Sequence, residues 1–159
     1  MKTKIIKDLE NEYMYQPFVV ELKKAIDFAN EWYFQGRVHI AETYRSPERQ
    51  QELFDDPKIY AAEPYRSYHQ MGIAADIWIE DLYGDYSNNH EEYRRLTEIF
   101  SRFKLRYLRN KDLVHFQWPT VHRPYEYAMN YMPLSELKLV QGFHKILDAE
   151  CLVYENWGY

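Results

Sequence analysis

Apolar and polar positions recur with two different periods along this chain, and the change of period predicts a mixture of helices and strands. Between residues 17 and 32 the apolar side chains fall every three or four positions, as on one face of a helix: Phe18, Leu22, Ala25, Ile26 and Ala29. Gly36 ends this helix or turns the chain after it. Residues 37–43 then predict a short strand.

Two further helices carry start signals. Ser46 followed by Pro47 is typical of a helix N-terminus, with serine as the cap and proline in the first turn. This helix should end near residues 55–57, because a residue that precedes a proline avoids the helical region. Asn89 followed by Glu92 resembles a capping box. The helix that it opens has an apolar stripe made of Tyr93, Leu96, Ile99, Phe100 and Phe103.

Alternation with a period of two predicts a strand at residues 73–79. One face of this strand carries Ala74, Asp76 and Trp78. The opposite face carries Ile73, Ala75, Ile77 and Ile79. Residues 105–108 and 113–118 predict two more strands joined by a turn at 110–111, which together indicate a hairpin.

After Pro119 the pattern becomes helical again, with a helix between residue 133 and about residue 150. Its predicted face is Leu134, Leu137, Val140, His144 and Leu147. No repeat, low-complexity segment or linker divides the chain. We therefore expect one domain over residues 1–159, in which residues 120–159 form a C-terminal helical extension of unknown role. The expected fold class is α+β, a small antiparallel sheet with packed helices.

The composition fits a globular domain and disfavours several functions. The 159 residues are 46% hydrophobic and 28% charged, and their net charge of −5 argues against a nucleic-acid partner. Cys151 is the only cysteine, which rules out an internal disulfide and a cysteine-based zinc site. The aromatic share of 18% suits sugars and peptides as ligands, or tyrosine-rich packing. No stretch is apolar enough to cross a membrane, and no signal peptide is evident, so we expect synthesis in the cytoplasm.

The chemistry concentrates in the stretch from Ser67 to Asp76. Between His69 and Asp76, the small residues Gly72 and Ala74 leave room for a metal ion and a substrate backbone. A hydrolytic zinc site takes three protein ligands of histidine or carboxylate type and keeps one position for water. His115, on the predicted strand at residues 113–118, supplies a third ligand. His69, Asp76 and His115 are therefore the candidate zinc ligands.

Three more residues fit hydrolysis at such a centre. A carboxylate must take a proton from water and pass it to the leaving amine, and Asp112 is the candidate base. An ideal strand would place Asp112 and His115 on opposite faces, so this role needs a turn or a bulge between them. Arg45 can clamp a substrate carboxylate or stabilise an oxyanion, or it can serve as a structural ion-pair partner. Gln50 can brace that loop or the substrate.

These residues resemble the M15 family of zinc peptidases, which comprises D-Ala-D-Ala carboxypeptidases, D,D-dipeptidases and L-alanyl-D-glutamate endopeptidases of phages and bacteria. Its motif Ser-x-His-x-x-Gly-x-Ala-x-Asp is met by Ser67, His69, Gly72, Ala74 and Asp76. An Arg-Ser pair followed by Gln is met by Arg45, Ser46 and Gln50. An acid followed by His and an aromatic residue is met by Asp112, His115 and Phe116. The resemblance spans residues 37–118.

The resemblance implies the M15 D,D-peptidase (Hedgehog-like) fold and zinc held by the two histidines and the aspartate. It also implies that Asp112 is the base, that Arg45 binds the substrate or transition state, and that Ser67 touches the substrate. The expected activity is hydrolysis of a peptide bond in peptidoglycan stem peptides, as an endolysin-like L-alanyl-D-glutamate endopeptidase. The alternative within the family is a D-Ala-D-Ala carboxypeptidase or dipeptidase. The enzyme would act on the cell wall after release by another protein.

A hypothesis from another class is a zinc-stabilised binding module without catalytic activity. Retention of Asp112 argues against it, because a binding module needs no base. Simpler roles also exist for single residues: Asp112 as a turn former, and Ser67 and Gln50 as hydrogen-bond partners of the backbone. The histidines outside the motifs are expected to have surface or packing roles, and they are His39, His90, His122 and His144.

Overall fold

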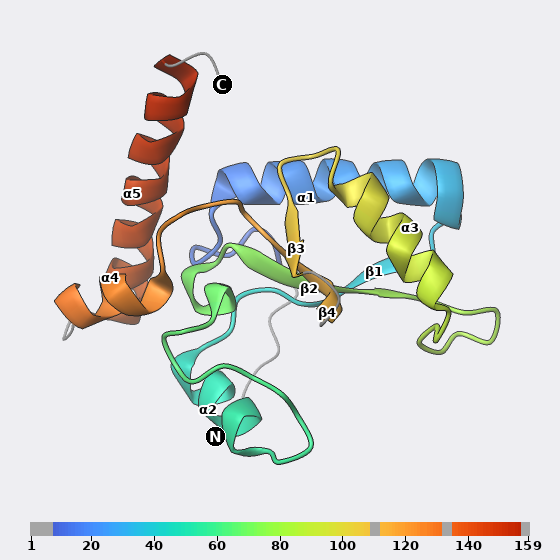
Figure 1. Ribbon diagram of the computed structural model, residues 1–159, viewed down its shortest axis with the longest axis horizontal. Coiled ribbons are helices and arrows are strands. Elements are labelled where there is room, and N and C mark those ends of the chain that lie inside the picture. Colours follow the sequence, from blue (N-terminus) through green and yellow to red (C-terminus); the bar gives the residue numbers. More distant parts are fainter. Residues whose placement is uncertain (1–7, 109–111, 132–134, 157–159) are drawn as a thin grey trace.

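The computed structural model describes residues 8–108, 112–131 and 135–156, without the side chains of residues 108, 112, 113 and 152–156. A four-stranded antiparallel sheet lies at the centre, and helices pack around it (Figure 1). The elements in chain order are α1 (Gln16–Ala29), η1 (Asn30–Phe34), β1 (Val38–Glu42), α2 (Pro47–Asp55), η2 (Tyr68–Met71), β2 (Ala74–Ile79), α3 (His90–Phe100), β3 (Arg106–Leu108), β4 (Asp112–Gln117), α4 (Pro124–Tyr131) and α5 (Glu136–Asn156). This confirms the expected α+β class.

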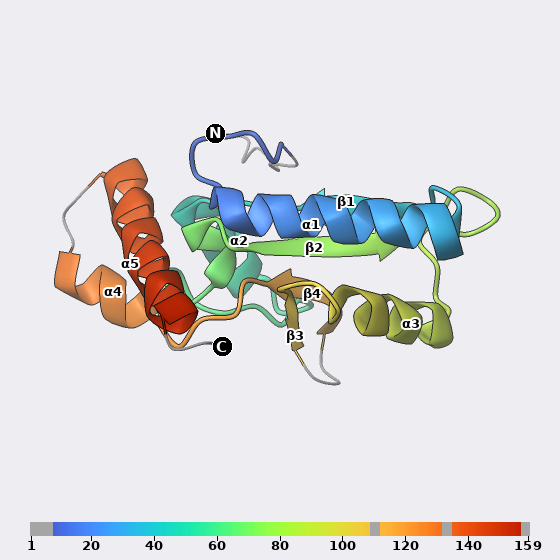
Figure 2. The same cartoon turned by 90° about the horizontal axis from the view of Figure 1, so that it is seen from above.

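The strand order in the sheet is β1-β2-β4-β3. Helix α1 lies along one face of this sheet, and α3 packs beside it, as the view from above shows (Figure 2). Phe18 and Leu22 of α1 are fully buried there, and so are the inward residues Ile77 of β2 and Phe116 of β4. Each such side chain contributes about 1.5–3 kcal/mol of burial free energy. The predicted separation of the two faces of residues 73–79 is therefore confirmed, and the face that carries Asp76 is turned away from α1.

Two irregularities in the sheet decide which side chains reach this second face, which we call the open face. In β1 the register with β2 shifts between Ile40 and Glu42, so Ala41 is an extra residue. Without this bulge Glu42 would follow Ile40 toward the core; with it, Glu42 pairs with Asp76 on the open face. In β4 a second shift occurs opposite Tyr107 and Leu108.

The helix termini follow the local signals with one exception. The Ser46 hydroxyl accepts a hydrogen bond from the amide of Arg49, as predicted for an N-cap. The Asn89 side chain caps α3 through the amide of Glu91. The predicted capping box is wrong, because the carboxylate of Glu92 accepts from Ser87 and Arg37 instead of returning to the Asn89 amide. That amide donates to the Ser87 hydroxyl.

The C-terminal helices pack at the end of the sheet that carries η2 (Figure 1). The buried face of α5 is only partly the predicted one: it includes Val140 and Leu147, with Leu139 and Phe143 beside them. Leu134 and the predicted turn at residues 110–111 lie outside the described residues. The imidazole of His144 donates from Nε2 to the Met71 carbonyl at 2.7 Å. Within the described residues, no helix is long and apolar enough to cross a membrane.

Candidate metal centre

The stretch before β2 brings His69 to the open face of the sheet. Ser67 caps the short helix η2 through the amide of His69, and Gly72 ends it in the left-handed region, at φ 66°. A Cβ on Gly72 would lie 1.7 Å from the carbonyl oxygen of Tyr13, so only glycine fits at this position. The turn therefore returns the chain into β2 a few residues after His69, with Asp76 as the third residue of the strand.

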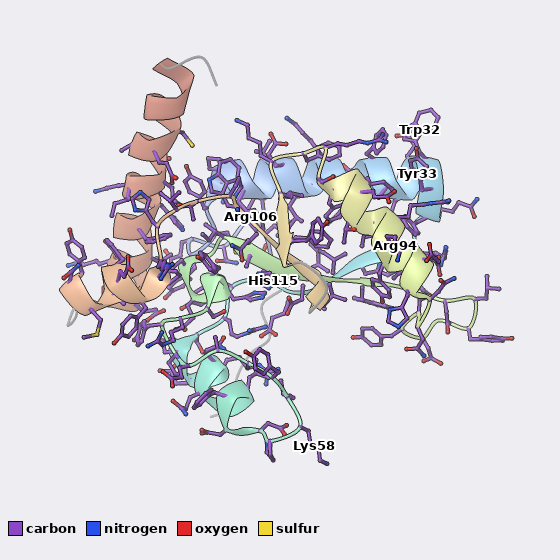
Figure 3. The ribbon with its side chains drawn as sticks, in the orientation of Figure 1. Trp32, Tyr33, Lys58, Arg94, Arg106 and His115 are labelled. Carbon is purple, nitrogen blue, oxygen red and sulfur yellow. The ribbon has the colours of Figure 1, made fainter. Side chains whose placement is uncertain are left out.

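Strand pairing brings the third residue to the same place. Asp76 of β2 and His115 of β4 are direct partners in the antiparallel register. Both side chains therefore stand on the open face, at the Cβ separation of about 4.5–5.5 Å typical of paired residues. Figure 3 places His115 near the middle of the sheet. Three residues from η2, β2 and β4, up to 46 positions apart in sequence, thus share one site.

The three side chains converge on one point. The Nε2 atom of His69 lies 3.1 Å from Oδ1 of Asp76 and 3.1 Å from Nδ1 of His115. The His115 Nδ1 atom lies 3.4 Å from the same Asp76 oxygen. Ligands placed about 2.0–2.1 Å from a tetrahedral zinc ion are separated by about 3.3–3.4 Å. The triangle of donor atoms therefore has the size that a zinc ion requires.

The far sides of both imidazoles determine where their protons lie. Nδ1 of His69 is 2.7 Å from the carbonyl oxygen of Thr43, which can only accept, so this nitrogen carries the hydrogen. Nε2 of His115 is likewise 2.9 Å from the amide oxygen of Gln117. The inner nitrogens of the neutral rings then present lone pairs to each other and to Asp76. Such backing of histidines by outer acceptors is typical of metal sites.

The charge state of Asp76 agrees with this arrangement. Burial opposes ionisation of the carboxyl group, but the charge and hydrogen bonds that His69 and His115 supply when protonated outweigh burial and hold the pKa of Asp76 well below its usual range. With the neutral rings described above, a bound cation would take the place of those protons. The second oxygen, Oδ2, accepts a hydrogen bond from Nη2 of Arg45 at 3.0 Å. An ionised carboxylate and two imidazole lone pairs are electron-rich groups that a cation holds together. His69, Asp76 and His115 can therefore hold a metal ion.

Arg45 lies beneath this centre as part of a buried network. Its Nη2 also donates to Glu42 at 3.1 Å, and its Nη1 donates to Gln50 at 3.1 Å. Arg45 is only 8% exposed and makes the ion pairs of its simpler alternative role, while its predicted role toward the substrate or transition state stays a prediction. Glu42 was missed as a site residue, because the bulge that turns it to the open face has no signature in the sequence. Gln117 was also missed, although it stands two positions after His115.

Ser67 and Gln50 both make backbone contacts. The Ser67 hydroxyl accepts from the amide of His69 at 3.3 Å. The amide group of Gln50 bridges Arg45 and the carbonyl of Ala62, and thereby ties α2 to the loop that follows it. These contacts match the simpler roles considered for both residues, and their predicted roles in substrate binding stay predictions.

The backbone around Asp112 has the irregularity that a base at this position requires. Tyr107 pairs with Phe116, yet the next residue, Leu108, pairs with Asp112. Three residues of β4 therefore bulge between Asp112 and Phe116. The simple alternation that would separate Asp112 from His115 does not apply across such a bulge. The side chain of Asp112 lies outside the described part of the structure.

The remaining histidines stay apart from the centre. His39 pairs with Glu80 at 2.7 Å, and His122 lies 3.9 Å from Glu150. His144 contacts η2 from α5 and has a packing role. Among the described residues, the centre itself is the one group of three or more His, Cys, Asp or Glu side chains with this convergence.

Comparison with known proteins identifies the fold. No family model matches the sequence. No curated protein matches it closely enough to be significant. Among solved structures, the L,D-carboxypeptidase DacB of Streptococcus pneumoniae is 24% identical with a TM-score of 0.50, over 67% of this chain and 66% of that chain. This chain thus spans just under two thirds of the length of DacB.

Two further structures cover more of the chain. The vancomycin-resistance D,D-pentapeptidase VanY, solved as a variant in complex with Zn(II), is 22% identical with a TM-score of 0.56, over 87% of this chain and 90% of that chain. The L-Ala D-Glu endopeptidase ChiX of Serratia marcescens is 19% identical with a TM-score of 0.53, over 73% and 89%. The predicted resemblance to the M15 peptidases is therefore confirmed at the level of the fold.

Proposed function

We propose that this chain, which has the fold of the M15 peptidases, is a zinc-dependent peptidase that hydrolyses a peptide bond in peptidoglycan stem peptides. One observation carries the proposal: three donor atoms from His69, Asp76 and His115 converge at 3.1–3.4 Å, with both histidine protons directed outward. When bound there, zinc supplies Lewis acidity toward the scissile carbonyl and lowers the pKa of water. Nitrogen and carboxylate ligands of this kind favour zinc over magnesium or calcium.

The other residues of the centre have separate roles. Asp112 takes the proton of the attacking water and delivers it to the leaving amine. Its position at the start of β4, next to a bulge, supports this role. Arg45 is a positioning residue: it holds Oδ2 of Asp76 and so leaves Oδ1 facing His69 and His115, where it would bind a metal ion. Ser67 and Gln50 maintain the loops on which His69 and Arg45 stand.

The charges beside the centre suit an acidic peptide. Arg106 of β3 pairs with Gln117 and so stands on the open face, exposed, with no ion pair to any described residue. Tyr68, next to His69, lies near the guanidinium groups of Arg106 and Arg123. Burial raises the pKa of the Tyr68 hydroxyl, whereas the positive charges of Arg123 and Arg106 act to lower it. Stem peptides of peptidoglycan carry free carboxylates, which guanidinium groups bind well.

We propose L-alanyl-D-glutamate endopeptidase activity, with D-Ala-D-Ala carboxypeptidase or dipeptidase activity as the alternative. Digestion of purified peptidoglycan followed by mass spectrometry separates the two. New N-terminal D-Glu is the expected product, whereas free D-Ala identifies the alternative. Release of neither product from several wall chemotypes, with zinc bound, would refute a peptidase.

The remaining alternative is a zinc-stabilised binding module. It is tested with Asp112→Ala, which removes the base but none of the three proposed ligands. Loss of wall lysis with the zinc content unchanged supports the enzyme, because the ligand set and the chemistry are then separable. Equal lysis by Asp112→Ala and the unmodified protein removes Asp112 from the mechanism.

A further inference from the structure

A cluster of aromatic side chains continues the open face beyond the metal centre. We call the rings of His39, Trp78 and Tyr86, together with the adjoining carboxylate of Glu80, the aromatic platform. The ring centroids of His39 and Trp78 lie 4.8 Å apart, and those of Trp78 and Tyr86 lie 4.4 Å apart. Tyr86 is 62% exposed. The platform therefore presents closely packed, tilted rings at the surface, although none of these residues belongs to the proposed catalytic centre.

Strand register fixes the platform on the same face as the metal ligands. His39 of β1 pairs directly with Trp78 of β2, and Trp78 is two positions after Asp76. Glu80 and Tyr86 form an isolated antiparallel bridge beyond the end of β2, so they too share this face. Because side chains at i and i+2 project on one side of a strand, the open face runs without interruption from Asp76 to Trp78 and Glu80.

The loop that carries Tyr86 is held by its own hydrogen bonds. Oδ1 of Asp81 accepts from the amides of Tyr83 and Asp85, at 2.8 and 3.0 Å. The backbone amide of Asp81 donates to the Asp85 carbonyl at 2.8 Å. This closed turn leads the chain back to Tyr86, whose ring then contacts Trp78. The platform is thus built into the fold.

The chemistry of the platform suits a saccharide. Rings of tryptophan and tyrosine offer flat apolar contact with polar tips, which matches the apolar faces and hydroxyl edges of a pyranose. At its rim, Nε2 of His39 lies 2.7 Å from Oε2 of Glu80, and both side chains are 37% exposed. This pair supplies donors and acceptors for hydroxyl and acetamido groups.

We propose that the aromatic platform is a subsite for the amino sugar that bears the stem peptide, so that the preferred substrate is glycan-attached. The inference rests on the proposed endopeptidase function. The C–N bond that is cleaved lies at the carbonyl carbon of L-alanine. This alanine is joined to the sugar ring through one lactyl unit. Two residue-like units span roughly 7 Å when extended. Asp76 and Trp78 are separated along β2 by about the same distance, two residues of strand.

The spacing also discriminates between the two peptidase activities. In a D-Ala-D-Ala carboxypeptidase the sugar lies several residues from the bond that is cut, too far for a ring at Trp78 while the carbonyl is at the metal. A sugar subsite two strand residues from Asp76 is therefore consistent with cleavage at the first peptide bond after the sugar. The platform would then bind the sugar while the first peptide bond after it lies at the metal centre.

The test compares two substrates with the same peptide, one attached to the GlcNAc-MurNAc disaccharide and one free. We expect kcat/KM to be about tenfold higher for the attached peptide. Trp78→Ala should bring kcat/KM for the attached peptide down to that for the free one. Trp32→Ala is the matched control, because Trp32 is 66% exposed and lies at the far end of the α1–η1 helix, away from His115 (Figure 3).

Tyr86→Ala is a second variant in case Trp78→Ala fails to fold, since the Tyr86 ring is mostly exposed. Equal kcat/KM for both substrates in the unmodified protein, or a preference that survives in both variants, overturns the inference. If the protein cuts neither substrate, the proposed function is wrong, and binding of the peptide-free disaccharide is then measured by NMR. Binding that is lost in Trp78→Ala and kept in Trp32→Ala supports the platform, and no binding refutes it.

Discussion

Zinc binding at the centre should be visible as a rise in thermal stability. A ligand that binds only the folded state at 100 times its Kd adds about 2.7 kcal/mol to the free energy of unfolding. For a domain of 159 residues, each kcal/mol raises the midpoint temperature by about 2–4 °C. We therefore expect Zn²⁺ at that saturation to raise the midpoint by about 5–11 °C.

The measurement is a thermal melt of chelator-treated protein with increasing Zn²⁺, followed by circular dichroism, with Mg²⁺ as a comparison. Mg²⁺ should have little effect, because it prefers an all-oxygen environment. His115→Ala removes one of the three converging atoms and should abolish most of the shift. His122→Ala is the matched control: it removes an imidazole that lies 3.9 Å from Glu150, away from the centre. A full Zn²⁺ shift in His115→Ala, or none in the unmodified protein, refutes the assigned ligand set.

Three other predictions concern the support of the centre. Gly72→Ala should lower the free energy of unfolding by more than about 2 kcal/mol. The left-handed backbone alone costs an alanine roughly 1–2 kcal/mol, and the added Cβ would also lie 1.7 Å from the Tyr13 carbonyl oxygen. Gly84→Ala is the control: its Cβ would lie 3.6 Å from the nearest atom, so only the cost of the left-handed backbone should be lost from the free energy of unfolding. Equal losses for Gly72→Ala and Gly84→Ala in urea melts would contradict a steric clash at Gly72. Gln117→Leu removes the oxygen that accepts the outer proton of His115. It should weaken zinc affinity about 10–100-fold in a competition titration. An unchanged affinity would show that Gln117 does not support His115 as a zinc ligand. Burial lowers the pKa of His144, so the unfolded state binds the proton more tightly, and the free energy of unfolding should decrease as pH falls through about 6.5. His144→Gln should reduce this pH dependence in melts at pH 5–8. An unchanged pH dependence would show that His144 is not its source.

Local sequence patterns determined most of the elements, because caps and periodicity act over a few residues. The Ser46 cap, the stripe of α3 and the two faces of β2 follow from neighbours in sequence, and the structure contains all three. The same local information placed His69 and Asp76 seven positions apart around a turn that needs Gly72. The identity of the candidate centre was thus available from the sequence, since its residue types and spacing are short-range features.

Tertiary structure alone decided how these groups meet. The bulge at Ala41 turns Glu42 from the core side to the open face, and the bulge in β4 removes the alternation that would separate Asp112 from His115. Neither bulge has a local signal, because each results from the register between strands far apart in the chain. The protons of His69 and His115 are likewise set by acceptors that only the folded sheet and loops bring into place. The sequence was therefore enough to identify the candidate ligands, whereas the pairing of distant strands brought their side chains to one point and placed the aromatic platform on the same face.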